Sequence, residues 1–81
     1  MFDVRTTSPL DDHWEQRDEL LYTLAGGKSD WSGTEMTHDR TQVRVHGWRV
    51  STFQEAINLR KKFAKVKTVH ATVNESCTAK R

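Results

Sequence analysis

The chain has 81 residues, 35% of them hydrophobic and 30% charged, which is enough for one small core and too little for a second domain. A single cysteine, Cys77, excludes an intrachain disulfide framework, and the sequence has neither a signal-peptide pattern nor the ~18-residue apolar run of a membrane span. We therefore expect a small, soluble, cytoplasmic protein with one domain over residues 1–75 and a polar tail at residues 76–81.

The first 27 residues predict a strand and a helix. Phe2 and Val4 alternate with charged residues, which is typical of a short half-buried strand. Ser8 has the character of an N-cap and is followed by a proline at the first helical position, so we expect a helix over residues 9–24. The pair at 26–27 is Gly-Gly, which favours a left-handed C-terminal cap.

The middle of the chain predicts two strands. Residues 31–36 form a weak, irregular edge strand in this interpretation, and the sequence THDR at 37–40 is typical of a turn. Residues 41–50, TQVRVHGWRV, carry the clearest alternation of valine with polar residues in the chain. They predict the strongest strand of the sheet.

That alternation changes phase at His46-Gly47. The pair could form the turn of a tiny hairpin or a bulge that adds one residue to a continuous strand, and both restore the phase. We favour the bulge, because three-residue arms are short for a hairpin. A bulge would bury one set of residues and turn another outward; the buried set is Val43, Val45, Trp48 and Val50, and the outward set is Arg44, His46 and Arg49.

The last third predicts a helix and a strand. A capping box, formed by Ser51 with Gln54 or by Thr52 with Glu55, precedes a helical apolar pattern that extends to about residue 66. Residues 67–73 then alternate valine and alanine with polar residues, as a final strand does.

The order strand, helix, strand, strand, helix, strand indicates an α+β ferredoxin-like fold. In this two-layer sandwich two helices cover one face of a four-stranded antiparallel sheet. The other face would be open and would carry the outward-pointing residues of the strands.

Charge is segregated along the chain. Residues 1–39 hold three basic and nine acidic side chains, whereas residues 40–81 hold ten basic and two acidic ones. Such asymmetry marks nucleic-acid or membrane contact in some proteins, but it also arises when an acidic element packs beside a basic one. We favour the second explanation, with the acidic first helix beside the basic second helix.

The sequence contains no motif that commits it to a chemistry. His13, His38, His46, His70 and Cys77 lack the spacing of a zinc site, and AGGKSD at 25–30 lacks the first glycine of a phosphate-binding loop. Nothing in the sequence points to a partner for a nucleophilic serine or cysteine. We expect no enzyme activity, no cofactor and no metal.

These observations favour a small non-catalytic protein that acts as an inhibitor or adaptor of a protein or nucleoprotein machine. Phage-encoded, host-directed proteins are of this kind. The expected partner-binding residues are Trp31, Arg44, His46 and Arg49, because exposed aromatic and arginine side chains dominate many interfaces. A homodimer that pairs an acidic surface with a basic one is a further option, and we expect no membrane partner.

The alternative is a module that binds RNA or single-stranded DNA through a basic sheet face and the second helix. Its contacts would be Arg5, Arg44, His46, Arg60, Lys61 and Lys65. The central strands lack the aromatic run on which RNA-recognition domains stack bases, so phosphate contacts would supply most of the affinity.

Overall fold

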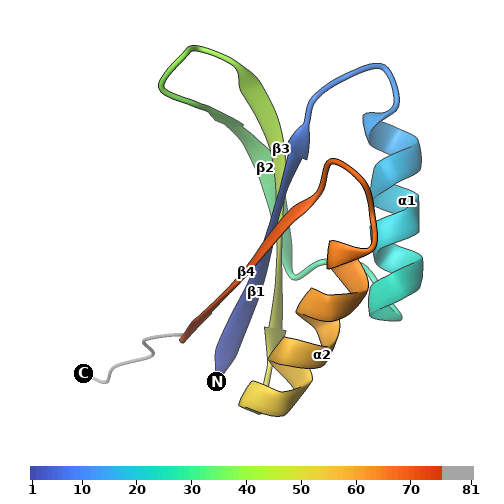
Figure 1. Cartoon of the computed structure of the whole chain (residues 1–81), viewed down its shortest axis with the longest axis vertical. Coiled ribbons are helices and arrows are strands. Elements are labelled where there is room, and N and C mark those ends of the chain that lie inside the picture. Colours follow the sequence, from blue (N-terminus) through green and yellow to red (C-terminus); the bar gives the residue numbers. More distant parts are fainter. Residues whose placement is uncertain (76–81) are drawn as a thin grey trace.

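The computed structural model describes residues 1–75 and contains four strands and two helices (Figure 1). In chain order they are β1 (Phe2–Pro9), α1 (Trp14–Ala25), β2 (Trp31–Met36), β3 (Gln42–Val50), α2 (Phe53–Ala64) and β4 (His70–Glu75). The sheet order is β2-β3-β1-β4 with every neighbouring pair antiparallel, and both helices lie on one face of the sheet (Figure 1). The fold is the predicted ferredoxin-like α+β sandwich.

The first helix begins later than the sequence predicts. Ser8 and Pro9 belong to β1, where they pair with Arg44 and Val43 of β3. The helix starts at Trp14 after His13, which makes no side-chain capping bond. The predicted Ser8 cap and Pro9 start are therefore wrong. Pro9 is the last residue of its strand, so its missing N–H falls where the hydrogen-bond ladder ends.

β3 runs without interruption, so both the predicted bulge and the predicted hairpin are wrong. Its register with β1 is constant from Phe2↔Val50 to Pro9↔Val43, and its register with β2 is constant as well. Because side chains alternate along a strand, β3 turns one set of residues to the helices and the other to the open face. The helix-facing set is Arg44, His46, Trp48 and Val50, and the open-face set is Val43, Val45, Gly47 and Arg49.

Gly47 forms neither a bulge nor a turn, but makes space for a neighbouring side chain. A Cβ atom at this position would lie 2.1 Å from Cε2 and Nε1 of Trp31, whose residue pairs with Gly47 in the sheet. The missing side chain gives the Trp31 indole the space in which it lies against the sheet.

The hydrophobic core lies between the sheet and the helices. Its buried members come from both layers: Val4, Leu21, Trp48, Ala56 and Phe63. α2 begins with the second of the two predicted capping boxes, in which Thr52 and Glu55 bond each other's backbone N–H groups. α1 ends at Gly26 in the left-handed conformation, as predicted.

Candidate functional site

A buried polar network connects α1 to β3. The Asp18 carboxylate accepts hydrogen bonds from Arg44 through Nε at 3.1 Å and Nη2 at 3.0 Å, and His46 Nε2 lies 2.8 Å from its other oxygen. The second ring nitrogen of His46, Nδ1, lies 3.0 Å from the Ser29 hydroxyl in the loop between α1 and β2. His46 is fully buried. Every polar atom of its ring therefore has a partner.

Aromatic rings enclose this network. The rings of Tyr22 and Trp48 lie 5.4 Å and 5.5 Å from the His46 ring, and the Arg44 guanidinium lies 5.0 Å from the centre of the Trp14 ring. Because Asp18 and His46 are buried, the hydrogen bonds between them are stronger than they would be at the surface.

The open face of the sheet carries charges that are already paired. Arg5 forms an ion pair with Glu35 at 2.5 Å, and Arg49 forms one with Asp3 at 3.3 Å. The Arg5 guanidinium also lies 5.5 Å from the centre of the Trp31 ring. An anionic ligand on this face would have to compete with the protein's own carboxylates.

The same side chains cover part of the open face. Val45 belongs to this face and lies outside the core cluster, yet it is only 2% exposed. Its neighbours on the adjacent rows of the same face include Trp31, Arg5 and Glu35. Trp31 itself stays 38% exposed.

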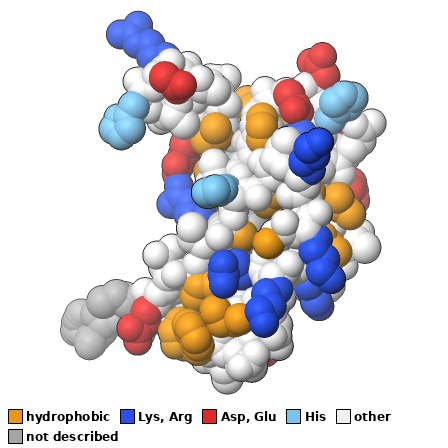
Figure 2. Space-filling model, in the orientation of Figure 1, with side chains coloured by type: hydrophobic (Ala, Val, Ile, Leu, Met, Phe, Trp, Pro, Cys, Tyr) orange, Lys and Arg blue, Asp and Glu red, His pale blue; other side chains and the backbone are white. Residues whose placement is uncertain are grey.

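The largest group of exposed cations lies on α2 and just after it. We call Arg60, Lys61, Lys62, Lys65 and Lys67 the basic patch; all five are exposed, and Figure 2 shows Lys and Arg side chains gathered over this helix. Within residues 1–75 no carboxylate lies within ion-pair distance of any of them.

Ion pairs within the molecule thus account for only part of the charge segregation along the chain. Asp3 and Asp18 of the acidic half pair with Arg49 and Arg44 of the basic half, but no ion pair joins α1 to α2 in the part of the chain that the structure describes. The expected pairing of the acidic first helix with the basic second helix is therefore wrong at the level of ion pairs.

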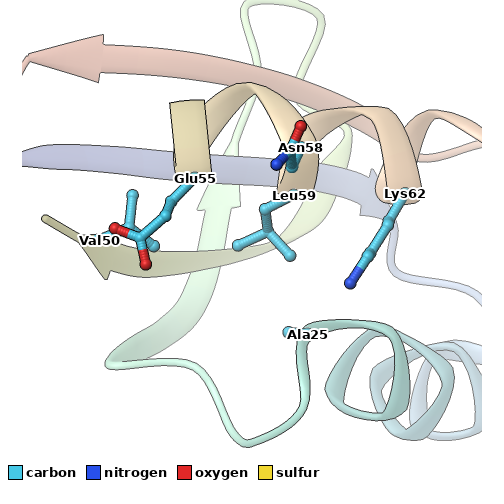
Figure 3. Close-up of a pocket in the computed structure, with 6 residues that line it drawn as sticks. All are labelled: Ala25, Val50, Glu55, Asn58, Leu59 and Lys62. Atoms are coloured by element: carbon cyan, nitrogen blue, oxygen red, sulfur yellow. The ribbon is translucent and has the colours of Figure 1, made fainter. Parts of the chain in front are cut away.

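A pocket of about 250 Å³ lies where the end of α1, the end of β3 and α2 meet (Figure 3). It is lined by Ala25, Val50, Glu55, Asn58, Leu59 and Lys62. Glu55 Oε1 is engaged in the capping box, and Asn58 Oδ1 accepts a hydrogen bond from Gln54 Nε2 at 3.0 Å, so the Lys62 ammonium is the charged group of the lining with no such partner among residues 1–75. The pocket adjoins the basic patch through Lys62.

Two exposed carboxyls have lowered pKa values. A hydrogen bond from Arg17 lowers the pKa of Asp11, helped by the His13 backbone N–H. A hydrogen bond from the Thr37 hydroxyl lowers the pKa of Asp39, within the predicted turn. Both carboxylates organise loops and neither faces the buried network.

The structure separates the predicted partner-binding residues. Trp31 and Arg49 lie on the open face, as expected, but Arg44 and His46 face the helices and bind Asp18. The prediction that Arg44 and His46 point outward is wrong, because their strand has no bulge. His46 has no surface to offer a partner.

The residues predicted to bind nucleic acid divide in the same way. Arg5 lies on the open face in an ion pair, whereas Arg44 and His46 are in the buried network. Arg60, Lys61 and Lys65 belong to the basic patch. Within residues 1–75 the predicted set therefore does not form a basic sheet face. The three predicted contacts on and after α2 do lie together on an exposed surface.

Asp18 and Ser29 are the residues that sequence reasoning missed. A signal for Asp18 existed: it lies four residues after Trp14 and three before Leu21, so it occupies a core-facing position of α1. Ser29 lies in a polar loop, and nothing local distinguishes it from the chain's other serines.

Within residues 1–75, no group of three or more His, Cys, Asp or Glu side chains is placed to hold a metal ion. None of the described helices is long and apolar enough to cross a membrane. Compared with known proteins, the chain matches no family model, no curated protein and no solved structure.

Proposed function

We propose that the chain is a small non-catalytic binding protein that acts as an inhibitor or adaptor by occupying an anionic surface of a protein or nucleoprotein partner. The observation that carries this proposal is the basic patch, whose five cations are exposed and have no ion partner among residues 1–75. By contrast, Arg5, Arg44 and Arg49 are all paired with carboxylates of the same chain. A phage origin and a host-directed target stay predictions.

Steering by unpaired charge supports this choice of surface. Like charges crowded on one face create a field that attracts an oppositely charged partner and raises the association rate. Lysines in the last turn of a helix and at its C-cap, where Lys65 lies, also interact favourably with its dipole, but Arg60 precedes the last turn of α2 and Lys67 lies two residues beyond the cap. The helix dipole therefore does not account for the whole patch.

The test compares two triple variants that lower the net charge equally. The patch variant carries Arg60→Gln, Lys61→Gln and Lys65→Gln, and the control carries Arg5→Gln, Arg40→Gln and Arg49→Gln. Partners captured from lysate are identified by mass spectrometry and their affinities are then measured with purified components. We expect the control to keep the partner and the patch variant to lose it. Loss with Trp31→Ala and retention by the patch variant would place the interface on the open face instead.

A second candidate is direct binding of nucleic acid through α2 and the residue that follows it. It is favoured by one observation: three residues of the predicted contact set, Arg60, Lys61 and Lys65, belong to the basic patch. Fluorescence anisotropy with single- and double-stranded DNA and RNA tests it at about 50 and about 200 mM salt, where phosphate contacts weaken steeply. We expect the patch variant to reduce the salt slope by about one for each cation removed. No binding at the lower salt would eliminate this candidate.

A further inference from the structure

The buried network contains a chain of three groups that the proposed function does not use. Ser29 Oγ lies 3.0 Å from His46 Nδ1, and His46 Nε2 lies 2.8 Å from Asp18 Oδ1. The three residues come from the loop before β2, from β3 and from α1. A hydroxyl, an imidazole and a carboxylate in this order are the parts of an activated nucleophile.

The partners of His46 fix which nitrogen carries its proton. The Asp18 carboxylate, which also binds the Arg44 guanidinium, only accepts hydrogen bonds. His46 Nε2 must therefore donate to it, and in the neutral imidazole Nδ1 is left as an acceptor. The Ser29 hydroxyl then donates to Nδ1, which is the arrangement in which an imidazole withdraws a serine proton.

The loop holds Ser29 in place on both sides. Gly27 N–H donates to Tyr22 O at 2.9 Å, and Asp30 N–H donates to Gly47 O at 2.8 Å. Trp48 Nε1 donates to Gly27 O at 3.3 Å. Ser29 is half-buried whereas His46 and Asp18 are buried, so the serine is the most solvent-exposed of the three residues. Positioning of this kind lowers the cost of reaching a reactive geometry.

We propose that Ser29 is a reactive serine that takes up one acyl or phosphonyl group from an activated donor. With a fluorophosphonate, the Ser29 Oγ–P bond forms and the P–F bond breaks. Fluoride leaves with the bonding electron pair, and the serine proton passes to His46 Nδ1, where the Asp18 carboxylate stabilises the imidazolium. With an activated ester, the acyl carbon is attacked in the same way and the alkoxide or phenolate leaves.

The burial of His46 predicts modification without turnover. Hydrolysis of the adduct would require a water molecule at His46 Nδ1, but this ring is fully buried and packs against the Tyr22 and Trp48 rings. The adduct should therefore persist. This makes Ser29 a stoichiometric modification site, and the inference does not depend on the basic patch.

The experiment uses the full chain and a fluorophosphonate probe, with intact-mass measurement and peptide mapping. We expect a single adduct on Ser29, formed about 100-fold faster than any adduct on Ser29→Ala, since general-base assistance is worth at least this much. Ser51→Ala, which removes an exposed serine at the start of α2, should react like the wild type. No adduct above the Ser29→Ala background, or an adduct on Ser32, would overturn the proposal.

A second measurement separates activation from mere exposure. In a Cys77→Ser background, Ser29→Cys and Ser51→Cys are alkylated with iodoacetamide between pH 5 and pH 8. The groups that face His46 are Asp18 and Tyr22 from α1, Arg44 from β3 itself, Thr6 from β1 and Ser32 from β2. We expect the thiol of the Ser29→Cys variant to react faster at pH 6 than that of Ser51→Cys, because the imidazole takes its proton. Equal rates at pH 6 would overturn the proposal.

Discussion

The layer between the sheet and the helices has an apolar end and a polar end. At one end the helix-facing pairs of β1 and β3 are Phe2 with Val50 and Val4 with Trp48; at the other they are Thr6 with His46 and Ser8 with Arg44. The change occurs between two consecutive pairs on the same face of the sheet. One interface is thus built from two kinds of interaction.

The two ends make different contributions to the fold. Apolar burial is non-directional and proportional to area, so it stabilises the sandwich without fixing how α1 lies on the sheet. The contacts of Asp18 with Arg44 and His46 are directional, and a one-residue slip of β3 would carry both partners to the open face. We infer that the apolar end supplies most of the stability and the polar end fixes register.

Removing the largest fully buried side chain should weaken the apolar end. Phe63 is fully buried and lies 4.6 Å from the Trp48 ring, so Phe63→Ala should lower the free energy of unfolding by about 3–5 kcal/mol. Urea denaturation measures the loss. The matched control is Phe53→Ala on the same helix, where the side chain is 56% exposed and the expected loss is about 1 kcal/mol. Equal losses would contradict the assignment of the core.

Neutralising the shared carboxylate should weaken the polar end by less. Asp18→Asn keeps the size of the side chain but presents an amide to two donors, and we expect a loss of about 2–3 kcal/mol. Asp3→Asn is the matched control on the open face, where the ion pair with Arg49 is partly exposed and the expected loss is below about 1 kcal/mol. Chemical denaturation of both variants at neutral pH provides the comparison, and a larger effect at Asp3 would contradict it.

The sequence predicts which residues face the helices better at the apolar end of this layer than at the polar end. At the apolar end the predicted burial of Val4 and Trp48 is correct: the alternation marks Val4 as buried, whereas Trp48 was assigned to the buried face through a bulge that β3 does not contain. The element order, the Thr52–Glu55 box and the Gly26 cap are likewise visible in local patterns. Local rules suffice where the inward residue is the hydrophobic one.

At the polar end the prediction fails for a physical reason. The alternation of Val43 and Val45 indicated the helix-facing side of β3, but Asp18 makes it favourable for Arg44 and His46 to face the helices instead. Asp18 is 26 positions from Arg44 and 28 positions from His46 along the sequence. Hydrogen bonds between residues so far apart leave no periodic signal in either segment. The bulge was needed only while the valines were assumed to face the core, and the reactive-serine geometry depends on the same distant pairing.

The smallest expected effect tests the boundary between the two ends. Thr6 pairs with His46, its hydroxyl is fully buried, and Oγ1 has no hydrogen-bond partner within residues 1–75. A buried hydroxyl without a partner is destabilising, and valine has nearly the same shape and favours strands. Thr6→Val should therefore raise the free energy of unfolding by about 1 kcal/mol. The variant would extend the apolar part of the β1 face by one residue, from Val4 to position 6.

The control for this change is Thr72→Val, at an exposed position on the open face of β4, where we expect a change within about 0.5 kcal/mol. Thermal and urea unfolding of the two variants measure the difference. If Thr6→Val destabilises the protein instead, the hydroxyl is satisfied in solution, by water or by a rotated His46 network. Thr6 would then belong to the polar end by its hydrogen bonding as well as by its position, and the hydrogen-bonded chain from Asp18 to Ser29 would have a further contributor from β1.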